Sequence, residues 1–278
     1  MKKFRLKPGT KVSVHGRDYR GFATEIQFSE TSREGWYWRP FPEGPLLPIE
    51  ASLARYYKVF GFIYLRYGYS SFAVWEHIAA MFYTGLTGVI VEGSPHPPSF
   101  GRPLEYWEAL KPYLIESKEE VQWCRPLRPV EWSYPGSRRG YTRIEPNAKP
   151  FNLSLHVDIE IDYPRIGRLR KEFFFPSTLP LFVDAFNVHA QGYPNWKWRA
   201  AQLLSQFGWP HINAFVWPHE QTTTKTADLW WKHRLTDLMG GISLAAHNRL
   251  LAGKITSVCS GHLADLEVLR LADFIPSE

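Results

Sequence analysis

Acidic and histidine side chains occur in this sequence at spacings suited to metal-assisted chemistry. His233 and Asp237 are four residues apart in a segment of helical pattern, which places both side chains on one helix face, about one turn apart. Imidazole and carboxylate groups are ligands that Zn²⁺ accepts readily. Pairs at this spacing are common, so for this pair taken alone a solvated helix face or a simple side-chain hydrogen bond is the better explanation.

Two further sites repeat this chemistry elsewhere in the chain. Glu76 and His77 lie in the apolar stretch 73–80, where an unpaired buried charge would be costly. The alternative is that Glu76 faces solvent and His77 is a core histidine with satisfied hydrogen bonds. His262 follows a Ser-Gly pair at the start of an expected helix, where glycine lets the backbone approach a ligand. An exposed histidine near a helix start is the alternative there.

Considered together, these groups supply the parts of one reaction. Two histidines and one carboxylate leave a fourth zinc position open for water, which is the catalytic arrangement rather than the closed structural one. A second carboxylate beside a ligand can take a proton from that water, and a further histidine can protonate the product side. This combination predicts metal-assisted amide hydrolysis.

The elements that must position these residues can be read from hydrophobic periodicity and turn residues. In the first half, Ser71 is expected to cap a helix that Gly85 ends, and Pro103 to open a second helix. The expected elements of this half are strands at 11–15, 21–29 and 88–92 and helices at 72–84 and 103–110.

The second half shows the clearest strand of the chain. Apolar residues alternate with polar ones from 151 to 161, which is typical of a half-buried strand. The other expected elements are strands at 172–175 and 254–259, and helices at 196–207, at 227–251 with an interruption around Gly240-Gly241, and at 262–271.

Both halves run through strands, a helix, a glycine turn, a short strand and a last helix. This shared order predicts an α+β protein built from a duplicated unit, each domain a small sheet layered with helices and the site between the domains. We expect domains at 1–120 and 121–278, with an aromatic-rich insertion near 192–217 in the second.

Composition narrows the classes of partner and compartment. The net charge is +6 and the pI is near 9.2, which favours an anionic partner such as a phosphorylated ligand or an acidic membrane surface. No block of five or six basic residues occurs, so we expect no nucleic-acid partner. The two cysteines are far apart, which suits a reducing compartment. With no signal peptide or membrane span expected, the predicted location is cytoplasmic, and peripheral contact with a membrane would fit.

Several motifs resemble one family, the UDP-3-O-acyl-N-acetylglucosamine deacetylases, which are zinc enzymes of lipid A biosynthesis. The similarity begins with Val-His-Gly near the N-terminus and covers most of the chain in order and spacing, although about 95–225 aligns poorly. The motifs that carry it are Val14-His15-Gly16, Val74-Trp75-Glu76-His77-Ile78-Ala79-Ala80, Gly85-Leu86-Thr87-Gly88-Val89-Ile90-Val91-Glu92, His233-Arg234-Leu235-Thr236-Asp237-Leu238, Ala246-His247-Asn248 and Ser260-Gly261-His262.

The resemblance implies a role for each matching residue. His77, His233 and Asp237 match the ligands of a single zinc ion, with Fe²⁺ as an alternative because similar ligands bind both metals. Glu76 matches the general base, and His262 matches the histidine that stabilises the intermediate and protonates the leaving amine.

The resemblance also implies substrate contacts. Arg234 stands where the family has a substrate-binding Lys, and Phe186 matches a Phe beside the substrate. The family's second-domain insertion forms a tunnel for the acyl chain, which makes Trp196 and Trp198 candidates within 192–217. Packing of a surface helix on its own domain would account for these aromatic residues as well. The implied partner is an acylated UDP-amino sugar, and the sequence does not indicate the oligomeric state.

Three departures from the family leave the substrate open. Ala185 stands where the family has an oxyanion-holding Thr, Gly241 replaces the carboxylate that orients the catalytic histidine, and the family's Asp-Gly-Ser turn reads Phe-Gly-Arg at 100–102. Asp265 is a candidate to replace the lost carboxylate. The alternatives are therefore a deacetylase of another N-acetylated sugar nucleotide or glycolipid, or a non-catalytic sugar-binding relative.

Overall fold

A computed structural model of the 278-residue chain provides the fold. It describes residues 1–18, 21–58, 61–98, 103–135, 140–149, 152–163, 167–186, 190–192, 215–217, 224–245 and 249–277. The protein is of the mixed α+β class, as the sequence predicts. The division at residue 120 stays a prediction.

The first of two five-stranded sheets belongs to the N-terminal part of the chain. Its strand order is β2-β3-β9-β4-β5, and its central strand β9 runs antiparallel to β3 and parallel to β4. The strands are β2 (Lys11–Arg17), β3 (Ala23–Glu30), β9 (Val89–Gly93), β4 (Trp36–Trp38) and β5 (Leu47–Pro48).

The second five-stranded sheet comes from the later part of the chain. Its order is β12-β13-β19-β14-β15, and its central strand β19 runs antiparallel to β13 and parallel to β14. The strands are β12 (Val130–Ser133), β13 (Tyr141–Glu145), β19 (Gly253–Val258), β14 (Leu155–Tyr163) and β15 (Gly167–Phe175).

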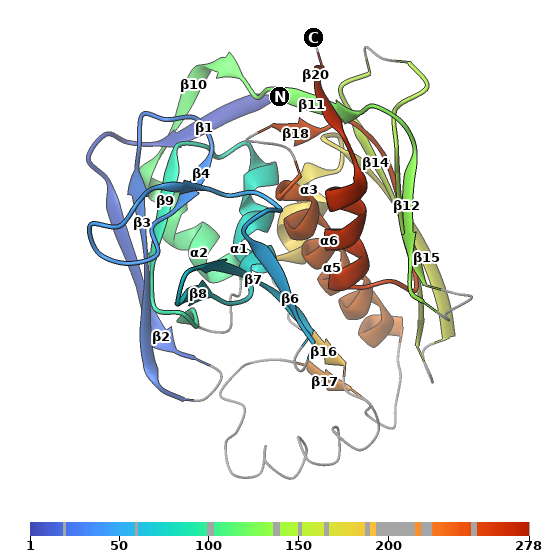
Figure 1. Ribbon diagram of the computed structural model, residues 1–278, viewed down its shortest axis with the longest axis horizontal. Coiled ribbons are helices and arrows are strands. Elements are labelled where there is room, and N and C mark those ends of the chain that lie inside the picture. The colour runs from blue at the N-terminus through green and yellow to red at the C-terminus, as the bar shows by residue number, and fades with distance from the viewer. Residues whose placement is uncertain are drawn as a thin grey trace.

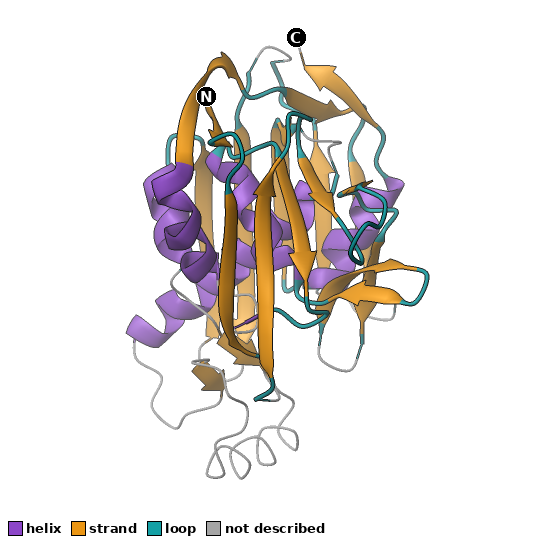
Figure 2. Cartoon of the chain, turned by 90° about the vertical axis from the view of Figure 1, so that its left-hand side faces the viewer, coloured by secondary structure: helices purple, strands orange, loops and turns teal. Residues whose placement is uncertain are grey.

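Helices fill the space between these two sheets (Figure 1). The view from the side shows long strands of one sheet in front of the helical layer (Figure 2). The helices are α1 (Trp75–Ala79), which continues into a 3₁₀ turn at Ala80–Thr84, α2 (Pro103–Leu110), followed by a 3₁₀ turn at Lys111–Tyr113, α3 (Leu179–Ala185), α5 (Thr224–Ser243) and α6 (His262–Leu271).

Smaller sheets of two or three strands complete the described part of the fold. A three-stranded sheet directly precedes α1, and the antiparallel pair of β1 and β10 joins segments far apart in the chain. These strands are β1 (Lys2–Leu6) and β10 (Leu114–Glu120), β6 (Ala54–Tyr57), β7 (Phe62–Tyr67) and β8 (Ser70–Phe72), β18 (Leu250–Leu251), β11 (Trp123–Pro126) and β20 (Phe274–Ser277), and β16 (Ala190–Gly192) and β17 (Phe215–Trp217).

Strand β14 shows how the alternating sequence builds the layers. Val157 and Ile159 are completely buried because the helical layer covers their face of the sheet. On the other face, Asp158 accepts hydrogen bonds from Arg170 of β15. Side chains on one face of a strand alternate with those on the other, so the period of two becomes an apolar inner face and a charged outer face.

Three expectations about helices were wrong: one start, one interruption and one end. Ser71 belongs to β8 instead of capping a helix, and α1 begins only at Trp75. Helix α5 continues without interruption through Gly240-Gly241 and ends at Ser243. Leu250 and Leu251, expected at the end of that helix, form β18 instead.

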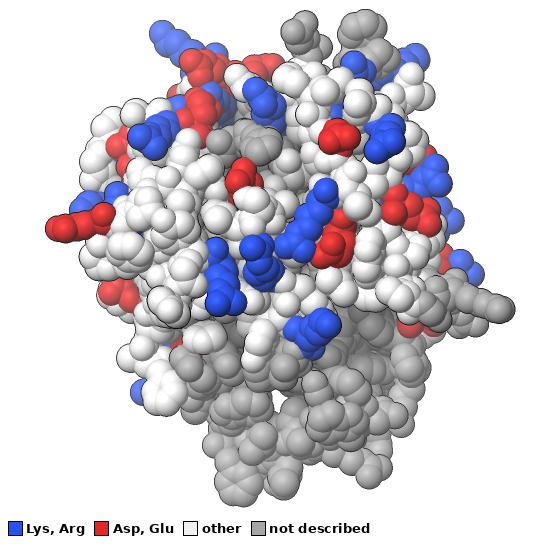
Figure 3. All heavy atoms as spheres, viewed as in Figure 1, with Lys and Arg blue, Asp and Glu red and all other residues white. Residues whose placement is uncertain are grey.

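Charge is spread over the face seen in Figure 1. Figure 3 shows basic and acidic side chains interspersed over much of this face, with basic side chains gathered near its centre. Among the described residues, no helix is both long enough and apolar enough to cross a membrane.

Candidate metal centre

The candidate site forms where α1 crosses α5. The crossing is close because Gly240 has no side chain: a Cβ built there would lie 1.5 Å from the backbone oxygen of Glu76. Glycine is the residue that permits such an approach of two backbones. Helix α1 is directed into this contact by Val74, whose φ of 55° is left-handed and costly for a β-branched residue.

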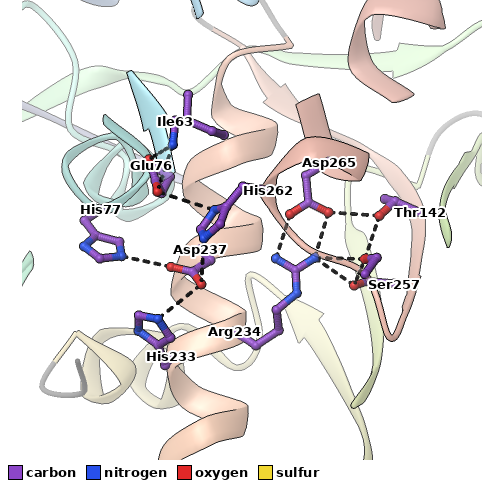
Figure 4. A network of polar contacts seen from close by, with 11 residues as sticks. Ile63, Glu76, His77, Thr142, His233, Arg234, Asp237, Ser257, His262 and Asp265 are labelled. Carbon is purple, nitrogen blue, oxygen red and sulfur yellow. Dashed lines mark hydrogen bonds and ion pairs between the residues drawn. The ribbon is translucent and has the colours of Figure 1, made fainter. Parts of the chain in front are cut away.

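The three predicted ligands meet at this crossing. One donor atom from each of His77, His233 and Asp237 lies within 4.8 Å of the other two. Nε2 of His77 is 2.9 Å from Oδ1 of Asp237, and Nε2 of His233 is 3.3 Å from Oδ2 of Asp237. Asp237 therefore lies between the two imidazoles (Figure 4). Its contact with His77 joins positions 160 residues apart in the chain.

Glu76 lies beside this cluster and is completely buried. The backbone N–H of Ile63 donates to both of its carboxyl oxygens, at 3.2 and 3.0 Å. Burial raises the pKa of Glu76, and nearby Asp237 raises it further, whereas His262 and His77 act in the opposite direction. A raised pKa makes this carboxylate a stronger proton acceptor than an exposed one.

His262 completes the group from the start of α6. Its Nδ1 lies 3.4 Å from Oε1 of Glu76 and its Nε2 lies 3.5 Å from Oδ2 of Asp237. The turn before it contains Cys259, a left-handed non-glycine residue with φ of 43°, three positions before His262. The side chains of His262 and His233 remain 17% and 12% exposed, so solvent reaches the cluster from their side.

The electrostatics of the ligands suit a cation. Burial lowers the pKa of His233 to about 4, which keeps its imidazole neutral at physiological pH. Burial alone would raise the pKa of Asp237, but His233, His262 and His77 around it bring it below the ordinary value. Neutral imidazole and ionised carboxylate are the states in which these groups bind metals.

The donor set could hold a metal ion, and its nitrogen and oxygen donors are of the kind that zinc binds. Zinc binds histidine nitrogen and carboxylate oxygen at about 2.0–2.2 Å, so donors that share one ion lie about 3–4 Å apart. His77 lies 2.9 Å from Oδ1 of Asp237 and His233 lies 3.3 Å from Oδ2, which is close to this spacing, and one donor atom from each residue lies within 4.8 Å of the others. The described part of the chain therefore contains a buried group of three residues that could hold a metal ion.

Comparisons with known proteins add no relative. No known family model matches this chain, and no curated protein matches it. The resemblance to the deacetylase family therefore stays a resemblance of sequence motifs. Of the residues in those motifs, Glu76, His77, His233, Asp237 and His262 lie together near the crossing of α1 and α5.

The remaining predicted residues lie elsewhere or outside the described residues. Arg234 is buried with its guanidinium group on Asp265, not among the ligands. Asp265, the candidate to orient His262, has both oxygens engaged by Arg234. Phe186 is buried and packs on Phe182 with ring centroids 4.9 Å apart. Trp196 and Trp198 lie outside the described residues, with most of 192–217.

Three features of the site were not predicted from the sequence. The amide of Ile63 that holds Glu76 carries no sequence signal, because any residue supplies a backbone N–H. The close packing at Gly240 did have a sequence signal, because a glycine pair inside a helical pattern can indicate close helix packing as well as an interruption of the helix. The link between Arg234 and Asp265 joins two helices whose relative placement the sequence does not reveal.

Proposed function

We propose that this protein is a zinc-dependent N-deacetylase acting on an acylated UDP-N-acetylglucosamine, as in the UDP-3-O-acyl-N-acetylglucosamine deacetylases that its motifs resemble. The observation that carries the proposal is the meeting of five side chains at one crossing: His77, His233 and Asp237 as the donor set, with Glu76 and His262 3.4 Å apart beside it.

The chemistry follows from the position of each group. A bound zinc ion supplies Lewis acidity, which lowers the pKa of water to about 7 and polarises a carbonyl. Glu76 takes the proton of the attacking water, whose oxygen forms a bond to the amide carbon. His262 stabilises the negative charge that develops on the carbonyl oxygen and donates a proton to nitrogen as the C–N bond breaks. Acetate and a free amino sugar are the products.

We infer that the two halves of the chain are a duplicated unit with the site between them. The two five-stranded sheets support this, since both place their central strand antiparallel to one neighbour and parallel to the other, in the same relative order. Each central strand follows a helix that carries ligands, α1 before β9 and α5 before β19.

The test measures metal and turnover separately. Purified protein loaded with zinc is incubated with UDP-3-O-acyl-N-acetylglucosamine, UDP-N-acetylglucosamine and N-acetylglucosamine, and amine and acetate release are followed. We expect one zinc per chain and release from the acylated nucleotide. Replacing Glu76→Gln should keep the zinc and lower turnover by at least about 100-fold, which is the range of general acid–base catalysis.

The results that contradict the proposal differ for each part of it. Unchanged turnover in Glu76→Gln would exclude its role as base. Stoichiometric zinc without release from any substrate would exclude deacetylation of these sugars, and failure to bind zinc would favour the non-catalytic sugar-binding alternative. Glu108→Gln on the exposed side of α2 is the matched control.

A second candidate keeps the reaction and changes the substrate. Ala185 and Gly241 stand where the family has a Thr and a carboxylate, and Arg234 is turned into the protein interior. These differences favour another N-acetylated sugar nucleotide or glycolipid. Release from such a substrate, at a higher kcat/KM than from the acylated UDP-sugar, would decide for this candidate.

A further inference from the structure

Arg234 directly follows the candidate ligand His233 in sequence, but its side chain lies on a different side of α5. Successive helical residues are rotated by about 100°, and Figure 4 shows the guanidinium group directed away from His233 and toward α6. Arg234 is only 4% exposed. It makes a two-point contact with Asp265 of α6, at 2.6 Å from Nη1 to Oδ2 and 2.7 Å from Nη2 to Oδ1.

Hydroxyl groups extend this contact to the turn that precedes His262. Nη2 of Arg234 also donates to the Oγ atoms of Ser257 and Ser260, at 2.9 and 3.1 Å. The Oγ1 of Thr142 donates to Oδ1 of Asp265 at 2.9 Å and lies 2.8 Å from Oγ of Ser260. The end of β19, the turn and the first turn of α6 are thus joined to α5 by one buried network.

The form of this network indicates positioning. A buried ion pair has a large desolvation cost and contributes little net stability compared with apolar packing. A planar guanidinium on a carboxylate, however, fixes both distance and direction. The network connects the helix that carries His233 and Asp237 to the helix that begins with His262. A misplacement of about 1 Å in such a group can cost about 100-fold in rate.

We propose that Arg234 and Asp265 are positioning residues that hold His262 against Glu76 and Asp237, and that Arg234 does not contact substrate. This assigns Arg234 a different role from the substrate-binding one that the family resemblance implies. Asp265 acts on His262 through the turn and the helix rather than through a direct hydrogen bond. The effect on turnover rests on the proposed deacetylase function, whereas the effect on the placement of His262 does not.

The experiment follows His262 directly and compares it with kinetics. The imidazole ¹H–¹³C signal of His262, assigned by its loss in His262→Gln, is recorded in zinc-loaded wild type, Arg234→Lys and Asp265→Asn. We expect a displaced or broadened His262 signal in both variants. We also expect kcat to fall by at least about 10-fold with KM within about 3-fold and zinc content unchanged, because misplaced groups affect the transition state more than ground-state binding.

The chain offers a matched control for the loss of a two-point contact. Arg170 makes a similar pair with Asp158 on the outer face of the second sheet, and its side chain is 58% exposed. Arg170→Lys removes the same chemistry away from the site and should leave the His262 signal, kcat and KM as in wild type.

Two outcomes would overturn the proposal, and a third would overturn only the proposed function. A raised KM with kcat retained and the His262 signal unmoved in Arg234→Lys would make Arg234 a substrate-binding residue. A lower melting temperature with unchanged signal and kinetics would make the pair merely structural. If wild type releases no amine, the proposed function fails, and the His262 signal still decides the placement.

A double variant guards against failure to fold. Arg234→Met with Asp265→Leu removes both charges and keeps the interior filled, a replacement that is often neutral or stabilising. We expect it to fold and still displace the His262 signal. A wild-type signal in this double variant would also overturn the proposal.

Discussion

At the scale of single residues, the carboxyl group of Glu76 is both completely buried and held by the amide of Ile63. Its folded-state pKa is raised, chiefly by burial, so the native protein binds this proton more tightly than the unfolded chain does. The charged form therefore destabilises the fold at any pH above the unfolded-state pKa, up to a plateau above the folded-state pKa.

The substitution Glu76→Gln should raise the stability of the metal-free protein although it lowers turnover. Glutamine keeps an oxygen for the amide of Ile63 and removes the buried charge. In EDTA we expect its melting temperature to exceed that of wild type at pH 8, with the difference shrinking as the pH falls toward about 4.5, the unfolded value. Thermal melts across this range, with Glu108→Gln as an exposed control, measure it. A variant less stable than wild type at pH 8 would contradict the account.

At the scale of elements, the crossing of α1 and α5 depends on one of two adjacent glycines. A Cβ at Gly240 would overlap the backbone oxygen of Glu76 at 1.5 Å, whereas a Cβ at Gly241 would meet Asp265 Cβ at 3.5 Å, an ordinary contact. Backbone cannot move aside as a flexible side chain can, so the first change must displace α1.

Gly240→Ala and Gly241→Ala are therefore expected to differ in sign. Alanine favours a helix over glycine by up to about 1 kcal/mol, so Gly241→Ala should melt at or above the wild-type temperature with zinc affinity unchanged. Gly240→Ala should melt at a lower temperature, because overpacking lowers the free energy of unfolding by about 1–3 kcal/mol. It should also bind zinc at least about 10-fold more weakly. Calorimetry and zinc titration measure both, and equal behaviour of the two variants would refute this view of the crossing.

Local signals in the sequence predicted some elements well. The bounds of α2 and α6 agree with the expected 103–110 and 262–271, since proline at the first position and a glycine turn mark helix starts. The start of α1 was missed because Ser71 is a good capping residue, whereas the observed start depends on a left-handed Val74 that no propensity favours.

Contacts between residues far apart in the chain could not be predicted from the sequence. Strands β1 and β10 pair Lys2 with Glu120, and such partners cannot be recognised from either segment alone. The candidate metal-binding residues His77, His233 and Asp237 were predicted from their donor chemistry considered together and from the motifs that resemble a known family, and neither source requires coordinates. The direction of Arg234 was not, because it depends on where α6 packs against α5.

At the scale of the whole molecule, the donor set joins a short helix early in the chain to a long helix near its end. A metal that binds only the folded state stabilises it by an amount that rises with its concentration, about 2.7 kcal/mol at 100 times Kd. Zinc added after EDTA treatment should therefore raise the melting temperature by roughly 5 °C or more.

Two variants from opposite halves test whether the stabilisation requires both. His77→Gln on α1 and His233→Gln on α5 should each abolish most of the zinc-dependent rise, and His156→Gln on the outer face of β14 should keep it. A rise that persists in either ligand variant would mean that zinc stabilises the protein from another position.

The buried contact between Arg234 and Asp265 also restricts how this sequence can diverge. Replacing one of the two with a neutral residue leaves the other as an uncompensated charge in the interior, at a cost of about 3–5 kcal/mol. This cost is a large part of the stability of a typical domain. A lineage that exchanges the two residues one at a time therefore passes through an intermediate whose free energy of unfolding is lower by about this amount. We therefore expect residues 234 and 265 to change together rather than singly during evolution.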